Sequence, residues 1–201
     1  MRVPLLLEVA DQPVLCVGAG PVAAAKARPL LDAGAHLTVV APDVHPDLAD
    51  AHVVHRRAYA TADLADPAPR LVVAATGVPE VDGRVGADAA ARGIWCLRAD
   101  GRGDVATPAT IRRGDALIAL ATGAPALTRR LREHLDPLVD DRWGEASTTL
   151  SRVRADADVR AALAAVPPAE RRERWRRAVT AVVEADGGAG EAAAILRGAE
   201  V

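Results

Sequence analysis

The stretch VLCVGAGPVAAAKARPLLDAGAHLTVVAP, residues 14–42, decides the expected fold. Strand-forming residues at 14–18 lead into the turn Gly18-Ala19-Gly20, and apolar residues at helical spacing follow over 21–33, where Gly34 ends the pattern. A second strand-forming run occupies 37–41. A strand, a glycine-rich turn, a helix and another strand within about 30 residues are typical of a dinucleotide-binding unit.

The small residues of this turn match the roles that a dinucleotide requires. The first glycine makes the tight turn, the second lets a pyrophosphate approach the backbone, and a small third residue allows the helix to pack closely on the sheet. A proline in the first helical turn loses no hydrogen bond, and the free amides and helix dipole there favour a phosphate. We therefore expect NAD to bind at the residues Gly18, Ala19, Gly20, Pro21, Val22 and Ala23. A tight turn with a purely structural role is the competing interpretation.

Two further positions are candidates for the cofactor site. Asp43 lies two residues beyond the second strand and would bind the ribose hydroxyls; no arginine follows it to accept a 2′-phosphate, which favours NAD over NADP. A solvent-facing loop carboxylate is the alternative for Asp43. Ala75 and Thr76 end the strand-forming run 71–75, where ligands bind in open α/β sheets, so we expect them on the nicotinamide side.

The order of elements predicts the fold class. Strands are predicted at 53–54, 71–75, 94–97 and 116–121, with a helix over 79–92. Apolar strands alternating with helices predict an α/β fold with a Rossmann-like, doubly wound and mostly parallel sheet. After residue 124 the pattern predicts only helices, broken at Pro137, at Pro167-Pro168 and at Gly187-Gly188.

Composition excludes several classes of partner. Lys and Arg number 25 against 27 Asp and Glu, and this balance predicts no general attraction to nucleic acid or to an acidic membrane. No apolar run approaches the roughly 20 residues of a membrane span. Cys16 and Cys96 lie in apolar runs without a CxxC motif, which favours buried thiols in a reducing compartment, the cytoplasm. His134 has no spaced partner, so we expect no metal site.

Three segments carry a resemblance to a known family: 4–42, 71–94 and 112–135. They occur in the order found in the dehydrogenase-chelatase module at the N-terminus of siroheme synthase, and the chain therefore resembles the precorrin-2 dehydrogenase / sirohydrochlorin ferrochelatase family. The resemblance implies that NAD accepts a hydride as precorrin-2 becomes sirohydrochlorin, and that Fe(II) is a chelation substrate. It also implies a homodimer with an NAD-binding domain over 1–110, a dimerisation and substrate region over 111–145, and a helical region over 146–201.

The resemblance also places a catalytic residue. The family's aspartate ends a pattern of the type I-x-C-N-V-V-D, and Ile94, Cys96 and Asp100 match it. Dehydrogenation and metal insertion both remove protons, so the carboxylate of Asp100 would act as the base in each. From the residues alone, a turn aspartate before Gly101 is the preferred interpretation.

The substrate side matches the family less well than the nucleotide side. Leu97 stands where the family has asparagine, Gly77 and Asp82 stand at acidic and asparagine positions, and a serine-containing turn is reduced to 122–125. A tetrapyrrole that carries many carboxylates needs cationic donors, and arginine suits them by its fork. The candidates are Arg98, Arg112 and Arg129.

These departures keep other functions open. A catalytically decayed NAD- or tetrapyrrole-binding protein of the same fold is one alternative, and an unrelated Rossmann dehydrogenase is another. The basic run 170–177 is interleaved with glutamates, which favours an exposed or dimer-facing helix over a nucleic-acid site.

Overall fold

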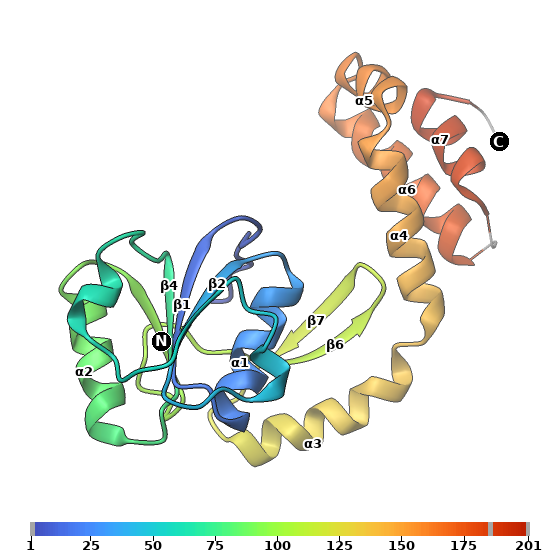
Figure 1. The fold of residues 1–201 in the computed structure, drawn as a ribbon. Coiled ribbons are helices and arrows are strands. Elements are labelled where there is room, and N and C mark those ends of the chain that lie inside the picture. The colour runs from blue at the N-terminus through green and yellow to red at the C-terminus, as the bar shows by residue number, and fades with distance from the viewer. Residues whose placement is uncertain (1–2, 185–186, 200–201) are drawn as a thin grey trace. The chain divides into compact units, whose positions relative to one another are not determined.

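The computed structural model describes residues 3–184 and 187–199. It divides into two compact units, Met1–Thr107 and Pro108–Val201 (Figure 1). The first unit holds the predicted nucleotide-binding turn, and the second holds the helices predicted beyond residue 124.

The first unit is built on one parallel sheet of five strands in the order β3-β2-β1-β4-β5. The chain builds β1, β2 and β3 toward one edge and then crosses over to add β4 and β5 at the other. The direction of winding therefore reverses between β1 and β4, which is the switch point of a doubly wound sheet. The strand bounds are Pro13–Val17 (β1), His36–Val40 (β2), Val53–His55 (β3), Leu71–Ala74 (β4) and Trp95–Arg98 (β5).

Helices cover both faces of this sheet, because alternate strand residues face opposite sides. Val14 and Cys16 of β1 pack in the core that contains the alanines of α1 (Pro21–Asp32). Leu15 and Val17 pack in the second core, beside Val85 of α2 (Pro79–Ala90). Figure 1 shows α1 and α2 on opposite sides of the strands. The predicted Rossmann-like α/β fold is confirmed.

The small residues of α1 let it approach the sheet closely. Ala23, Ala24 and Ala27 are almost completely buried, whereas Val22 at the helix start is 58% exposed. Two short 3-10 helices, η1 (Pro46–Leu48) and η2 (Thr61–Leu64), complete this unit and each buries a leucine.

The second unit begins with a hairpin that the sequence predicted only in part. The strands β6 (Ala109–Arg113) and β7 (Ala116–Leu120) form an antiparallel pair of their own. The predicted strand at 116–121 therefore exists but does not join the parallel sheet, and β6 was missed. In β6 only Ile111 is buried, and its arginines and threonine hide the strand signal.

Helices form the rest of the second unit. Apolar residues of α4 to α7 share one core that includes Val153, Leu163, Val182 and Leu196. The bounds are Pro125–Leu135 (α3), Asp136–Leu138 (η3, a 3-10 turn), Asp141–Ala155 (α4), Ala157–Ala164 (α5), Pro168–Glu184 (α6) and Ala189–Arg197 (α7). Among the described residues, none of the helices combines the length and apolarity needed to cross a bilayer.

The segment 143–166, predicted as one continuous helix, is two helices separated at Asp156. This residue has extended backbone, and its carboxylate accepts hydrogen bonds from the amides of Asp158 and Val159. Asp156 is thus the N-cap of α5, and the cap competes with helix continuation for the same residue. The apolar spacing on both sides concealed this break.

Replacing the cap should destabilise the helical part of the second unit. We expect Asp156→Ala to lower the free energy of unfolding by about 1 kcal/mol, because two amides of α5 lose their acceptor. Urea unfolding followed by circular dichroism measures the change. Asp156→Asn retains a side-chain oxygen and serves as the control; an alanine variant as stable as wild type would contradict the assigned cap.

Candidate functional site

The turn after β1 is held against the end of β4 at a distance that only glycine permits. Gly18 has φ +93°, and a Cβ there would lie 2.4 Å from the carbonyl oxygen of Ala75 and 2.7 Å from Cα of Thr76. The Gly18 amide also donates to the carbonyl of Val40 at 2.9 Å. This turn therefore joins the carboxyl ends of three neighbouring strands, where a doubly wound sheet binds its ligand.

Neither the backbone conformation nor the packing of the chain requires a glycine at position 20. It is exposed, its φ of −76° is open to any residue, and a Cβ built on it meets no atom within 4 Å. The space in front of Gly20 is therefore free for a ligand to approach the backbone. This is the arrangement predicted for the second glycine of a dinucleotide-binding turn.

The start of α1 is suited to an anion. The first amides of a helix have no partner within the helix, and here no side chain caps them. The first turn of α1 carries no acidic residue, in contrast to α2, whose first turn contains Glu80 and Asp82. The positive end of the helix dipole at Pro21 is therefore not neutralised by the protein's own carboxylates.

The loop that carries Asp43 is tied to the glycine turn. The amide of His45 donates to the carbonyl of Ala19 at 2.9 Å. Asp43 is exposed, and the structure shows no hydrogen bond or ion pair for its side chain among the described residues. Its carboxylate is thus available beside the turn for the role of a ribose acceptor.

The loop after β4 is organised by a buried carboxylate that the sequence-based prediction did not assign to the site. Asp82, 5% exposed, accepts hydrogen bonds from the amide of Thr76 at 2.9 Å and from its hydroxyl at 2.7 Å. The Thr76 hydroxyl in turn accepts from the amide of Val78. Because Thr76 lies directly against Gly18, Asp82 holds one wall of the predicted nucleotide site. An acid in the first turn of the following helix was the available sequence signal.

Asp100 lies in the turn after β5, at the same edge of the sheet. Its carboxylate accepts from the amide of Arg102 at 3.0 Å and from Nε and Nη2 of Arg98 at 3.1 and 2.6 Å. The amide of Arg102 and then the guanidinium of Arg98 lower the pKa of this exposed carboxyl. The structure thus brings together two residues predicted for the site, Arg98 and Asp100, and it pairs them with each other.

The other two predicted substrate arginines belong to the second unit. Arg112 lies exposed on β6, and Arg129 on α3 has an 84% exposed side chain that pairs with Glu133. An exposed ion pair of this kind contributes little free energy, so Glu133 competes only weakly with an anionic ligand.

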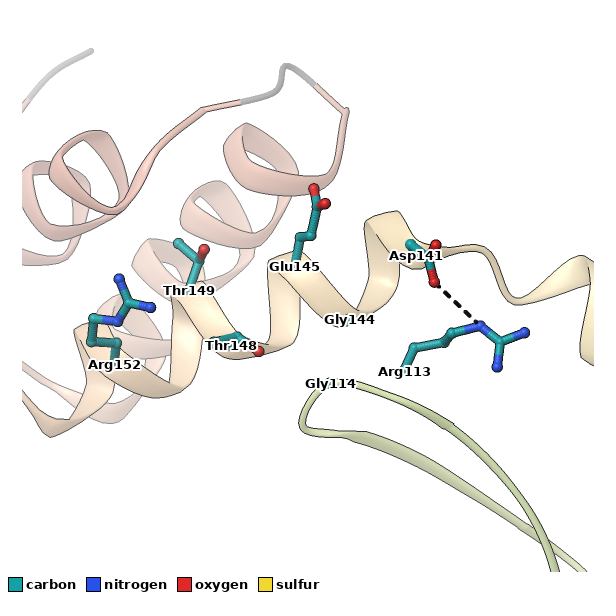
Figure 2. Close-up of a pocket in the computed structure, with 8 residues that line it drawn as sticks. All are labelled: Arg113, Gly114, Asp141, Gly144, Glu145, Thr148, Thr149 and Arg152. Carbon is teal, nitrogen blue, oxygen red and sulfur yellow. Dashed lines mark ion pairs between the residues drawn. The ribbon is translucent and has the colours of Figure 1, made fainter.

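Two hollows lie away from the carboxyl edge of the sheet. One, of about 510 Å³, is lined by residues that precede or begin β1, β4 and β5, so it lies at the amino end of these strands. The other, of about 390 Å³, lies in the second unit between the hairpin turn and α4 (Figure 2). Neither contains a residue predicted for the site. At the nucleotide turn the observation is instead the open space in front of Gly20, where a Cβ would meet no atom within 4 Å.

The second hollow exists because two glycines bring the hairpin turn onto α4. A Cβ at Gly114 would lie 2.9 Å from the Thr148 hydroxyl, and one at Gly144 would lie 2.7 Å from the backbone of Arg113. Figure 2 shows Arg113 directed toward Asp141, whose carboxylate lies 3.6 Å from Nε. The hollow thus follows from close backbone packing, and one of its two arginines, Arg113, is already paired with Asp136 and Asp141.

The thiols and the possible metal ligands offer no reactive group at the described site, and the thiol of Cys16 is a packing group that donates to the carbonyl of Gly18 at 3.2 Å. Cys16 and Cys96 are free and buried, and burial raises the pKa of their thiols to about 12 and about 11. No group of three His, Cys, Asp or Glu side chains within residues 3–184 and 187–199 is placed to hold a metal ion. Both thiols are therefore protonated packing groups at neutral pH.

Comparison with known proteins assigns the first unit to an NAD(P)-binding family. A family model described as "Putative NAD(P)-binding" matches residues 5–109. Relatives include siroheme synthase of Tolumonas auensis, 40% identical over 70% of this chain and 31% of that protein, and siroheme synthase 1 of Aeromonas salmonicida, 37% identical over 89% and 39%. The chain thus spans about a third of the length of these relatives.

A solved structure agrees with the whole fold. The protein titled "SirC, precorrin-2 dehydrogenase" superposes with a TM-score of 0.68 over 91% of this chain and 90% of that chain, at 23% sequence identity. At this identity the match supports the fold.

The two glycines of the turn should respond differently to alanine. We expect Gly20→Ala to leave stability nearly unchanged but to weaken NAD binding at least about tenfold, because its methyl group enters ligand space. Gly18→Ala should instead destabilise the protein, because its Cβ collides with Ala75 and its φ is unfavourable. Calorimetric titration with NAD and thermal unfolding separate the two effects. Unchanged NAD affinity in Gly20→Ala would contradict the site.

Proposed function

This chain belongs to the NAD(P)-binding family matched by residues 5–109, the family of the precorrin-2 dehydrogenase module of siroheme synthase, and on that premise we propose that it is an NAD-dependent precorrin-2 dehydrogenase. Its product would be sirohydrochlorin, in siroheme biosynthesis. One observation carries the proposal: the nucleotide turn at Gly18–Gly20 and the carboxylate of Asp100 lie at the same edge of one parallel sheet. The proposed site of the hydride acceptor and the proposed base would thus share one edge.

The residues of the switch point would hold the cofactor. The backbone of 18–23 receives the pyrophosphate, Asp43 accepts the ribose hydroxyls, and Ala75 and Thr76 border the nicotinamide. When bound there, NAD supplies the acceptor for the hydride that leaves the macrocycle. The free amides of α1 and the open space at Gly20 support this placement, and the unpaired Asp43 supports NAD rather than NADP.

Asp100 would take the proton that dehydrogenation releases. Its lowered pKa keeps it in the carboxylate form at neutral pH, which is the form a base requires. The two hydrogen bonds from Arg98 and the one from Arg102 orient that carboxylate. The same interactions make it a weaker base, so its contribution depends on position more than on basicity.

Arginines of the second unit would bind the carboxylates of the tetrapyrrole. The exposure of Arg112 and Arg129 supports this role, since exposed guanidinium groups can pair with carboxylates in bidentate fashion.

Fe(II) would be a second substrate, inserted into sirohydrochlorin while Asp100 accepts the displaced protons. The proposed chelatase activity would thus use the same base as the dehydrogenation.

The proposed homodimer would use the start of the second unit, within the expected dimerisation region 111–145. The helix α3 buries none of its residues, and Leu127 on it is 58% exposed. Nearby in sequence, Ile118, Leu138 and Trp143 are also exposed. A second copy would remove these apolar side chains from water.

The two buried, free thiols support a reducing, cytoplasmic setting.

Turnover tests the enzymatic proposal. The purified protein with NAD should convert precorrin-2 to sirohydrochlorin, measured by absorbance, and Asp100→Asn should lower kcat by about 10²- to 10⁴-fold while NAD still binds. Asp158→Asn on α5 is the control for loss of a carboxylate. Wild-type turnover in Asp100→Asn would remove the base, whereas NAD binding without any turnover by the wild-type protein would support the non-catalytic alternative.

Oligomeric state tests the proposed interface. We expect a dimer in sedimentation velocity, and Leu127→Glu should raise its dissociation constant by about tenfold or more, because a buried interface position would receive a charge. Val179→Glu, at an exposed apolar position on α6, is the matched control. A monomeric wild-type protein, or equal dissociation constants for the two variants, would contradict this interface.

A further inference from the structure

Arg98 is unusually constrained for an arginine at a strand end. Its side chain is only 15% exposed, although it ends β5 at the open edge of the sheet. Nε and Nη2 reach the two different oxygens of the Asp100 carboxylate, at 3.1 and 2.6 Å. This is the bidentate fork, which fixes the plane of a carboxylate as well as its distance.

The helix α2 makes room for this side chain. A Cβ at Gly86 would lie 3.2 Å from Cδ of Arg98 and 3.4 Å from Nη1, closer than most side-chain carbons approach a neighbour. At Gly83, one turn earlier, the corresponding distance to Nη1 is an ordinary 3.8 Å. Glycine in the interior of a helix is less favourable than alanine. The space that Gly86 leaves for Arg98 explains why a glycine occupies this position.

We propose that Arg98 is a positioning residue for Asp100, held in place by the glycine face of α2. The proposal rests on the proposed function, because it assigns a role around the base of that reaction. It also changes the role expected for Arg98, because its guanidinium is directed to Asp100 and not to a substrate carboxylate.

The position matters because α2 also organises the nucleotide side. Asp82 in its first turn holds Thr76 against Gly18, and Gly86 on the same helix leaves room for Arg98. One rigid helix thus supports both the wall of the nucleotide turn and the partner of the base. A fixed distance between the hydride acceptor and the base is what positioning in catalysis requires.

The charges around Asp100 set the expected response to pH. Arg98 and Arg102 are the cations that act on it and lower its pKa. Burial and then the carboxylates of Asp104, Asp82 and Asp100 raise the pKa of the Cys96 thiol, which identifies Asp104 in the following loop and Asp82 on α2 as the carboxylates of the neighbouring elements. The strand β4, Leu71–Ala74, contributes no titratable side chain. Loss of Arg98 would remove its two hydrogen bonds and its charge while the amide and the charge of Arg102 remain, so the pKa of Asp100 should rise toward the usual value of an aspartate.

A purely structural ion pair makes different predictions from a positioning residue. The structural role predicts that removing Arg98 lowers the thermal stability and leaves the pH profile of turnover unchanged. The positioning role predicts that the acid limb of the kcat/KM profile moves to higher pH and that kcat falls by up to about 100-fold, while the affinity for NAD stays the same.

The first experiment compares Arg98→Met with Arg98→Lys and with Arg92→Met as a charge-matched control on the same unit. The methionine variant should show the shifted acid limb and the lower kcat. The lysine variant restores the charge without the fork, so its acid limb should return toward the wild-type position while kcat recovers only in part. A wild-type profile in Arg98→Met overturns the proposal.

The second experiment disturbs Arg98 without removing it. Gly86→Ala and Gly83→Ala both replace glycine by alanine in α2, but only the first places its methyl group in close contact with Arg98. We expect a lower kcat and a shifted acid limb in Gly86→Ala and a wild-type profile in Gly83→Ala. Equal profiles for the two variants overturn the proposal. Both variants remain informative if Arg98→Met fails to fold.

A third measurement separates this proposal from the proposed function. The carboxyl carbon of Asp100, assigned by comparison with Asp100→Asn, can be titrated by ¹³C NMR in the protein without substrate. Its pKa should be higher in Arg98→Met than in wild type, whether or not precorrin-2 is turned over. An unchanged pKa overturns the role of Arg98, whereas a shifted pKa without turnover in any variant leaves the pairing intact and rejects the dehydrogenase.

Discussion

The contact between Gly18 and the end of β4 is the constraint on which the rest of the site depends. The turn can reach Ala75 and Thr76 only because no Cβ occupies the space between them. This approach places the exposed start of α1 at the switch point, and it leaves Gly20 facing open space. A residue with a side chain at position 18 would separate the turn from β4 and remove the geometry that a pyrophosphate requires.

The helix α2 supports both the glycine turn and the pair of Arg98 with Asp100. Its buried Asp82 keeps the Thr76 loop against the glycine turn, and its Gly86 gives Arg98 room to pair with Asp100. One element thus carries both groups, the one that shapes the glycine turn and the one that leaves room for the partner of Asp100. The lowered pKa of Asp100 follows from the same arrangement, because Arg102 and Arg98 both donate to it.

Local patterns allowed much of this molecule to be predicted, and where they were ambiguous the prediction was wrong or incomplete. The turn at 18–20 and the buried strands were clear because a glycine pair between a strand and a helix, and short uninterrupted apolar runs, each fit few kinds of structure. The strand β6 was missed because its one buried side chain, Ile111, is surrounded by polar residues. The break at Asp156 was missed because a capping carboxylate and a surface carboxylate look the same in a sequence.

By itself the sequence determined the α/β class, the glycine turn and the candidate residues, since these depend on backbone freedom and on periodicity within short segments. Only the tertiary structure decided which of those residues meet: that Arg98 pairs with Asp100, that Asp82 holds Thr76, and that 116–120 pairs with β6 outside the parallel sheet. The physical reason is that a local pattern specifies an element, whereas contacts between elements depend on packing over the whole unit, which no short segment contains.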